Sequence, residues 1–358
     1  MEGKKVNRRD YLKYTGAGIG GLIVGGALGY LLKPSEVIKE TVTVTAPAIE
    51  RTVTITAKPT PSAPSYLFYF VTHATPHPFW DCVKKGALDA ATIFNVNVQF
   101  PYMEKFSAEK QAEFFREALA AKPHGIGITA AVPEAIRPYV KEARDKGIPV
   151  VCLNTADPSG LTPYMAYIGA DLYVQGRKVG EIGLKFAEKL GIKGGEAVVM
   201  IAEPGHVGLE ARARGIKDVL AGAGINTSKL DTGPEFTKAF ELLRSFLAAH
   251  PETKFIFGAD AYTTNFSGLA IEKMPELKDK VVTGGFDINP VTLEMIKKGF
   301  LLFSHDQQPY AQGFYTVAEL YTYLTAGVYP MSIETATGAV DATNVDEFTE
   351  LANKGYKG

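Results

Sequence analysis

The chain has 358 residues, of which 46% are hydrophobic, 11% aromatic and 22% charged, a composition that excludes a largely disordered protein. At about 150 residues per domain, this length predicts two domains and an extension. The formal net charge of -1 argues against a nucleic-acid partner, because neutralising phosphates requires a basic surface.

The N-terminal segment combines a basic start with an apolar stretch. Basic residues gather in residues 4–13, and residues 15–32 contain no charged side chain. This order predicts an export signal, and the adjacent Arg8-Arg9 resembles the twin-arginine export motif. Lys33-Pro34 follows the apolar run in place of a small-residue cleavage site. We therefore expect residues 1–33 to be an export signal or a membrane anchor, with the folded body on the extracytoplasmic face of the cell membrane.

The next segment, residues 34–65, is rich in Thr, Val, Ala and Pro. Prolines stand at positions 47, 59, 61 and 64 and interrupt any continuous helix or strand. The alternating Thr and Val residues are typical of a strand, but the Pro-rich flanks favour an extended tether between the membrane and the folded body.

From Tyr66 onward, short apolar runs alternate with stretches in which apolar residues recur at helical spacing. The predicted strands are residues 66–72, 96–100, 125–128, 149–153, 197–201, 254–257, 281–286 and 301–304. The predicted helices are residues 80–94, 108–121, 134–146, 174–190, 209–223, 238–249, 291–298 and 310–325. This alternation predicts an α/β fold with parallel sheets covered on both faces. In such folds ligands bind at the carboxyl ends of the strands.

Polar and aromatic residues follow most of the predicted strands. They are His73, His77, Phe79 and Trp80 after the first strand, Asn154 after the fourth, Arg212 and Arg214 after the fifth, Asp260 after the sixth, Asp287 after the seventh and Gln307 after the eighth. This mixture suits a polyhydroxylated ligand, because each hydroxyl group both donates and accepts hydrogen bonds and an aromatic ring covers the C–H face of a sugar. A matched nucleophile and base is not apparent, so we expect a binding protein and not an enzyme.

A metal site has weak support in the sequence. His73, His77 and Asp81 have the spacing of metal ligands, but Pro76 and Pro78 prevent the regular helix that would align them. We expect these histidines to be polar cleft residues and assign no metal.

Two further patterns also have ordinary explanations. Residues 16–21 fit the dinucleotide pattern G-x-G-x-x-G, but a basic export-type segment precedes them where a strand is required, so we expect no cofactor. Cys82 and Cys152 make neither a metal pattern nor a disulfide framework. We expect two separate buried thiols, with one disulfide as the alternative.

Four motifs together resemble the ribose- and galactose-binding protein family of ABC importers, which has the periplasmic type I fold. The motifs are residues 76–80 (PHPFW), where the family has an Asn-Pro-Phe-aromatic turn, 210–215 (EARARG), 284–287 (GGFD) and 307–310 (QQPY). The resemblance covers residues 66–341. Each motif is weak alone, but their order and their positions after strands make the set specific.

The resemblance implies two doubly wound parallel-sheet lobes joined by a three-segment hinge, which closes over a ligand. It assigns residues 66–169 and 308–335 to lobe 1, and residues 170–307 and 336–358 to lobe 2. It also implies capture of a monosaccharide or polyol for the permease subunits of an ABC importer. The alternatives are a sensing module that feeds a membrane receptor, and a binder of a nucleoside or an autoinducer-type sugar.

The motifs also carry expected roles for individual residues. These are ring stacking for Phe79 and Trp80, hydroxyl binding for Arg214, Asp287 and Gln307, and a second-lobe aromatic contact for Phe236. Arg212 and Arg214 lie two residues apart and cannot share a helix face, so we assign the ligand contact to Arg214, which directly precedes Gly215.

Several candidate positions depart from the family pattern. Where ribose binders carry Asn, this chain has His77, Thr129 and Ala259, the last followed by Asp260, and Asn154-Thr155 replaces an Asp-Arg pair. The loss of a charge pair predicts a ligand other than ribose, of different stereochemistry, or a polyol such as an inositol.

Overall fold

The computed structural model describes residues 41–46, 49–54, 66–336 and 338–358. These residues belong to two units, a hairpin near the N-terminus and a body from residue 66 onward. The expected export signal lies outside the described residues, as does the last part of the expected tether. Within the described part of the chain, no helix is both long and apolar enough to cross a membrane.

The N-terminal unit contains an antiparallel hairpin where we expected an extended tether. Strand β1 (Thr41–Ala46) pairs with β2 (Ile49–Thr54), and Ala46 stands opposite Ile49. The alternating β-branched Thr and Val residues decide the structure here, because such residues favour strands. Pro47 falls between the two strands in the sequence and therefore interrupts neither. The expectation of an extended chain was wrong for this segment.

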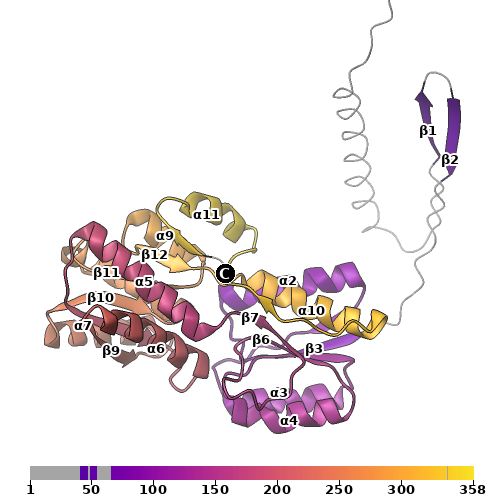
Figure 1. Ribbon diagram of the computed structural model, residues 1–358, viewed down its shortest axis with the longest axis horizontal. Helices are drawn as coiled ribbons and strands as arrows, with labels where there is room; N and C mark the ends of the chain where they lie inside the picture. Colours follow the sequence, from indigo (N-terminus) through magenta and orange to yellow (C-terminus); the bar gives the residue numbers. More distant parts are fainter. Residues whose placement is uncertain (1–40, 47–48, 55–65, 337) are drawn as a thin grey trace, which may run out of the picture. The chain divides into compact units, whose positions relative to one another are not determined.

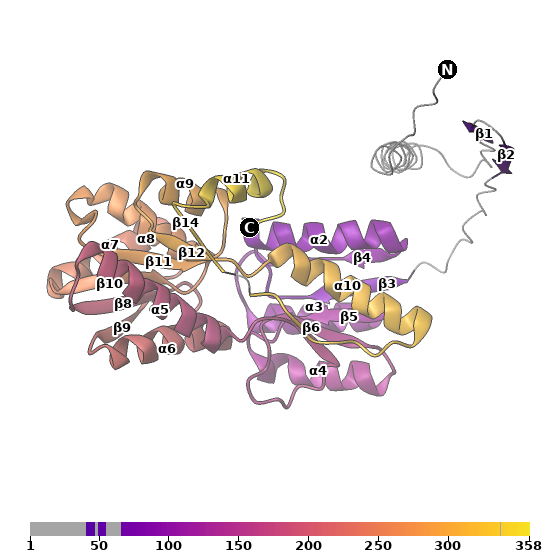
Figure 2. The same ribbon diagram turned by 45° about the horizontal axis from the view of Figure 1, so that its top comes forward.

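Lobe 1 is built around a six-stranded parallel sheet with the order β13-β7-β6-β5-β3-β4. Figure 1 labels β3, β6 and β7 of this sheet. Its strands are β3 (Leu67–Val71), β4 (Asn97–Gln99), β5 (Gly125–Ile128), β6 (Val150–Asn154), β7 (Ala166–Gly169) and β13 (Ile333–Glu334). Its helices are α2 (Pro78–Phe94) and α10 (Pro309–Ala326) on one face, and α3 (Ala108–Ala120) and α4 (Pro133–Asp145) on the other (Figure 2).

Lobe 2 repeats this plan with the strand order β14-β12-β11-β10-β8-β9, in which only β14 runs antiparallel to its neighbour. Its strands are β8 (Glu196–Ile201), β9 (Asn226–Asp231), β10 (Thr253–Gly258), β11 (Val282–Phe286), β12 (Phe303–His305) and β14 (Ala339–Asp341). Its helices are α5 (Leu172–Leu190), α6 (Val207–Gly222), α7 (Phe236–Ala249), α8 (Ala261–Lys273), α9 (Pro290–Lys298) and α11 (Val345–Asn353), with a 3-10 turn at Pro275–Leu277.

The chain passes between the lobes between β7 and α5, between β12 and α10, and between β13 and β14. The last two passages are joined, because the N–H of Asp306 donates to the carbonyl of Gly338 at 2.9 Å. Lys357, near the end of the described chain, forms an ion pair with the buried Asp306 carboxylate. The expected α/β fold with two parallel-dominated sheets is confirmed.

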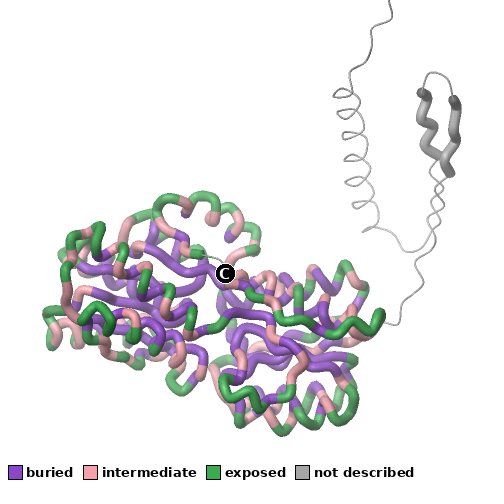
Figure 3. Tube along the Cα trace, viewed as in Figure 1, coloured by how far each residue is buried: buried purple, intermediate pink, exposed green. Residues whose placement is uncertain are grey.

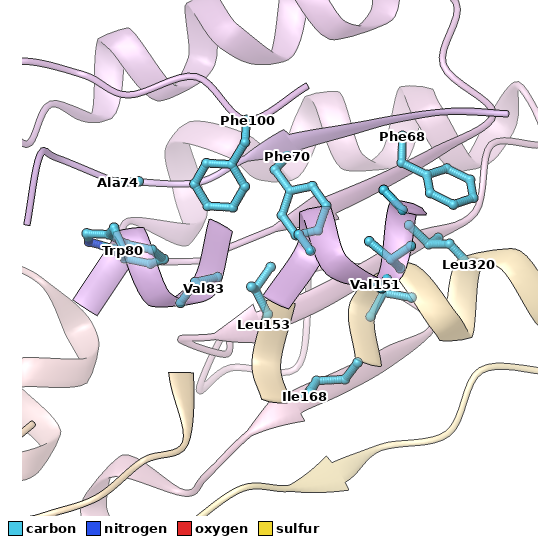
Figure 4. Close-up of a cluster of buried hydrophobic side chains, with 14 of the residues drawn as sticks. Phe68, Phe70, Ala74, Trp80, Val83, Phe100, Val151, Leu153, Ile168 and Leu320 are labelled. Atoms are coloured by element: carbon cyan, nitrogen blue, oxygen red, sulfur yellow. The ribbon is translucent and has the colours of Figure 1, made fainter. Parts of the chain in front are cut away.

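The strands form the most deeply buried part of each lobe, as Figure 3 shows. In lobe 1, Phe68 and Phe70 of β3 pack with Val83 of α2 and Leu320 of α10 (Figure 4). Trp80 lies at the end of this cluster far from Phe68, beyond the carboxyl end of β3. The core of lobe 1 therefore continues directly into the strand-end region where ligands bind in α/β folds.

Each lobe contains a helix pair that packs backbone against backbone through glycine. In lobe 1, a Cβ atom added at Gly313 of α10 would lie 1.9 Å from the carbonyl oxygen of Val83 in α2. Gly86 of α2 meets α10 in the same way, and Gly176 and Gly215 do so between α5 and α6 in lobe 2. At these glycines no side chain separates the helices, so a residue larger than glycine would force each pair apart.

The two cysteines are free and buried, which confirms the expectation of separate thiols. Cys82 lies in α2 and Cys152 in β6, where its Sγ atom donates to the carbonyl of Thr155 at 3.2 Å. Burial raises the pKa of Cys82 to about 12 and raises that of Cys152 as well. Both thiols are therefore protonated and unreactive at neutral pH.

Candidate functional site

A pocket lies between the two lobes, at the carboxyl ends of their parallel strands. It is lined by His73, Thr75, His77, Phe79, Trp80, Asn154 and Thr155 from lobe 1, by Leu172, Ala202, Glu203, His206, Leu209, Arg212, Asp260, Ala261, Tyr262 and Asp287 from lobe 2, and by Gln307 of the passage between β12 and α10. Most of these side chains are buried, so a ligand held here is removed from water.

The loop after β3 supplies the aromatic wall of lobe 1. His77 caps α2, because its Nδ1 atom accepts from the N–H of Phe79 at 3.2 Å. The helix begins at Pro78, and Phe79 and Trp80 follow, whose rings meet edge to face with centroids 5.0 Å apart. The short Pro-bounded turn thus fixes two rings against the pocket, where they can cover the apolar face of a sugar.

Two histidines from different lobes meet across the pocket. The Nε2 atoms of His73 and His206 are 3.2 Å apart. His206 caps α6, and its Nδ1 atom accepts from the N–H groups of Gly208 at 3.0 Å and Leu209 at 3.3 Å. Its proton therefore resides on Nε2, which donates to Nε2 of His73. The proton of His73 then resides on Nδ1, which donates to the Thr129 hydroxyl at 2.7 Å.

Arg212 is the buried cation of the pocket, with 4% of its surface exposed. It donates from Nη1 to the carbonyl of Ala259 at 2.9 Å and from Nη2 to Oε1 of Gln175 at 3.2 Å. Its guanidinium lies 4.1 Å from the centroid of the Phe286 ring. Its Nε group has no protein partner among the described residues, so the guanidinium keeps donors available for a ligand.

Asp287 and Gln307 join the pocket to the hinge. Asp287 adopts the left-handed backbone region, with φ of 76°, directly after β11. One of its carboxylate oxygens accepts from Nε2 of Gln307, and its carbonyl accepts from the Ser304 hydroxyl at 2.8 Å. Burial raises the pKa of Asp287 to about 7, although the Arg212 charge opposes this shift. A ligand hydroxyl can therefore meet either a carboxylate or a carboxyl group near neutral pH.

Two more acidic groups face the pocket from lobe 2. Asp260 caps α8, with one carboxylate oxygen accepting from the N–H of Thr263 at 2.9 Å and the other from that of Ala202 at 3.0 Å. Burial raises the pKa of Asp260. Burial, with the Asp260 charge as a second cause, raises the pKa of Glu203 to about 8. Asp260 is thus committed to the backbone, whereas Glu203 is a protonated carboxyl at neutral pH.

Tyr262 supplies the aromatic contact of lobe 2. Its hydroxyl lies 3.3 Å from that of Thr75 in lobe 1, and its ring centroid lies 4.4 Å from that of His77. We had expected Phe236 in this role. Phe236 instead packs against Phe240 and Phe266 beside the sheet of lobe 2 and does not line the pocket, so that expectation was wrong in position.

The structure brings most of the candidate residues together. His77, Phe79, Trp80, Asn154, Asp260, Asp287 and Gln307 all line the pocket. Thr129 does not line it, but lies behind His73 and binds both the ring and the backbone of that residue.

The choice of Arg214 over Arg212 was wrong in position. Arg214 is exposed and stacks on the ring of Tyr173, with its guanidinium 5.3 Å from the ring centroid. Its neighbour Gly215 packs against the backbone of α5, and this contact fixes the rotation of α6 so that Arg212 points into the pocket.

Sequence reasoning missed His206, Glu203 and Tyr262 as pocket residues. His206 and Glu203 follow β8 directly, and a strict reading of strand ends would have included them. Tyr262 was missed because α8, which carries it, was not predicted.

His73, Glu203 and His206 form the one group of metal-ligand type among the described residues, with donor atoms within 4.8 Å of one another. A metal would have to bind Nε2 of both histidines. In His206 that atom carries the proton, because Nδ1 accepts two backbone N–H groups. The trio is therefore a hydrogen-bonded cluster and not a preformed metal site.

Comparison with known proteins adds to this geometry. A family model described as a periplasmic binding protein domain matches residues 68–327. A xylose/arabinose-binding protein of Sulfolobus acidocaldarius is 29% identical over 312 residues, which cover 83% of this chain and 76% of the relative.

Two crystal structures are similar to most of this chain. A sugar-binding protein of an ABC transporter from Legionella pneumophila is 29% identical, with a TM-score of 0.72 and coverage of 76% of this chain and 100% of that one. A carbohydrate transporter from Acidothermus cellulolyticus, in complex with myo-inositol, is 27% identical, with a TM-score of 0.73 and coverage of 82% and 100%.

Proposed function

Because the chain belongs to the periplasmic binding protein domain family, we propose that it captures a monosaccharide or polyol between its lobes and presents it to an ABC importer. One observation carries this proposal. Two aromatic rings, a buried arginine with a free donor, and acidic and amide groups converge from both lobes on a single pocket beside the hinge. The family is that of a periplasmic binding protein domain, and the relatives are described as sugar-binding proteins, one of them of an ABC transporter, so we assign the protein a binding role and not an enzymatic one.

The chemistry of the pocket supports a neutral, hydroxyl-rich ligand. Arg212 offers a donor, Asp287 offers acceptors, and Gln307 ties Asp287 to the hinge. Trp80 and Phe79 offer flat apolar surface. The xylose/arabinose-binding relative and the myo-inositol complex support pentoses and cyclic polyols as the first ligands to test.

Ligand binding is testable by thermal shift on the purified protein. A ligand present at 100 times its Kd stabilises the native state by about 2.7 kcal/mol, because it binds the folded form only. We expect xylose, arabinose or myo-inositol to raise the Tm by several degrees, and mass spectrometry to recover the ligand unchanged. Buffer without any sugar or polyol, and buffer with the disaccharide sucrose, serve as controls. Absence of a shift with any monosaccharide or polyol would contradict the proposal.

We further propose that the protein is exported by the twin-arginine route and held at the extracytoplasmic membrane surface by its N-terminal segment. The basic and apolar pattern of residues 4–32 supports this proposal. In cell fractionation we expect the protein with the membranes, and its body to be accessible to protease added outside the cell. Replacing Arg8 and Arg9 together with lysine is expected to retain the protein in the cytoplasm. Unimpeded export of that variant would refute the route.

A further inference from the structure

The contact between His73 and His206 joins elements that move relative to each other when the hinge opens. His73 follows β3 in lobe 1, and His206 is the N-cap of α6 in lobe 2. The two rings meet edge to face with centroids 4.7 Å apart, and the side chains are 5% and 2% exposed. The loops around them make a second cross-lobe bond, from the N–H of Val207 to the carbonyl of Ala131 at 3.1 Å.

This contact requires that both imidazoles are neutral. A proton added to Nε2 of His73 would turn the acceptor of the cross-lobe bond into a second donor facing Nε2–H of His206. A proton added to Nδ1 of His206 would face the N–H groups of Gly208 and Leu209, which that atom now accepts. In both cases an attractive contact becomes a repulsive one.

The surroundings do not compensate an added charge. Arg212 from the same helix as His206 repels a second cation, and Trp80 and Phe106 present rings to His73. Glu203 is the nearest carboxyl group. Burial raises its pKa to about 8, so it is protonated and neutral in the acid range. Burial lowers the pKa of His73 well below its ordinary value and that of His206 to about 3.

We propose that His73 and His206 form a latch between the lobes that closes over a ligand while both imidazoles are neutral and opens when they become protonated. This inference rests on the proposed function, because it assigns a regulation to the same pocket. Of the other cross-lobe contacts, the bonds between Thr75 and Tyr262 and between Val207 and Ala131 involve no group that gains a charge in acid. The His77 ring, 4.4 Å from that of Tyr262, can gain one, and burial lowers its pKa to about 4. The latch is therefore the hydrogen-bonded cross-lobe contact that acid makes repulsive, and His77 titrates equally in wild type and in the variants that test the latch.

The direction of the pH effect follows from proton counting. In the open form both imidazoles meet water and titrate near the ordinary value of about 6.5, whereas the closed form excludes their protons. Affinity therefore falls as pH drops below about 6.5, by up to tenfold per pH unit for each histidine. Glu203, Asp260 and Asp287 act in the opposite direction, because burial raises their pKa values and closure favours their protonated forms. Comparison of variants separates the two effects.

The first experiment compares affinity profiles between pH 7.5 and 4 in buffer with EDTA. The probe is whichever of xylose, arabinose and myo-inositol binds wild type most tightly at pH 7.5. In His206→Asn the amide oxygen still caps α6, and in His73→Asn the amide still reaches Thr129, but neither variant titrates. We expect each variant to lose affinity less steeply than wild type, by up to tenfold per pH unit below 6.5. His250→Gln, a change in the sheet region of lobe 2 far from the pocket, is expected to follow wild type.

The second experiment needs no sugar. Exposed Lys105 in lobe 1 and Glu235 in lobe 2 are each replaced by cysteine and labelled for fluorescence energy transfer, since Cys82 and Cys152 are buried. We expect the distance between the labels to grow as pH falls from 7.5 to 4.5, and to grow less or not at all in the double variant His73→Asn/His206→Asn, in which His77 and the carboxyl groups still titrate. Equal pH responses in wild type and the double variant would overturn the latch. Failure of every sugar to bind at pH 7.5 would overturn the proposed function instead.

Discussion

Replacing Arg212 with alanine is expected to weaken sugar binding at least 100-fold. This corresponds to about 2.8 kcal/mol, because each tenfold change is worth about 1.4 kcal/mol. Arg212 is the buried cation of the pocket, and its guanidinium keeps donors available for a ligand hydroxyl. Hydrogen bonds from a charged donor are worth about 1.5–3 kcal/mol each. The substitution also removes the positive charge that opposes the rise in the pKa of Asp287, so this acceptor becomes more protonated. Titration calorimetry at pH 7.5 measures the loss.

Arg214→Ala is the matched control, because it removes the same side chain two positions away. Arg214 is exposed and contacts only the Tyr173 ring among the interactions described here, so its affinity is expected to stay within twofold of wild type. Arg212→Lys keeps the charge but loses the planar fork, and is expected to fall between the two. Denaturant unfolding of each variant separates misfolding from lost contact. If Arg214→Ala weakened binding as much as Arg212→Ala, Arg214 would be the ligand contact, as the sequence motif predicted, and the assignment to Arg212 would be refuted.

Replacing Gly313 with alanine is expected to cost about 3 kcal/mol of the free energy of unfolding. The new methyl group would lie 1.9 Å from the carbonyl oxygen of Val83, and a backbone atom cannot turn aside as a side chain can. Helices α2 and α10 must therefore move apart. This movement loosens the core cluster of lobe 1, which contains Phe70 and Leu320. Urea unfolding followed by circular dichroism measures the change.

Gly222→Ala provides the contrast in the same assay. Gly222 is the last residue of α6, is exposed, and has nothing within 4 Å of an added Cβ atom. There alanine is expected to stabilise the protein by about 0.5–1 kcal/mol, since it lowers the entropy of the unfolded chain. If Gly313→Ala proved as harmless as Gly222→Ala, the close approach of α2 and α10 would be wrong.

The fold could be predicted from the sequence wherever a pattern has one clear period. Strand β5 was predicted with its observed bounds from the short apolar run GIGI, which directly follows the polar Lys122-Pro123-His124. Helix α8 was missed because Thr264, Phe266, Ser267 and Ala270 are buried on several sides, so its sequence shows no single apolar stripe. Strand β9 was missed for the opposite reason, since NTSKLD lies at a sheet edge and is mostly polar. Hydrophobic periodicity identifies an element that buries a single face. Neither α8 nor β9 buries a single apolar face, so the pattern missed both.

The pocket could be predicted as a region but not residue by residue. The rule that ligands bind at strand ends located His77, Trp80 and Asp287 correctly in one pocket. The choice between Arg212 and Arg214 depends on the rotation of α6, which the contact of Gly215 with α5 sets. That contact joins residues far apart in sequence, and no local pattern records it.

The position of Trp80 has a practical consequence. It is the single tryptophan of the chain, and its ring lies against His73 in the pocket. Ultraviolet emission excited near 295 nm, where only indole absorbs strongly, therefore originates at one known point of the molecule. The unlabelled protein carries its own optical probe of ligand arrival, and a spectrum recorded during mixing would give the rate of capture directly.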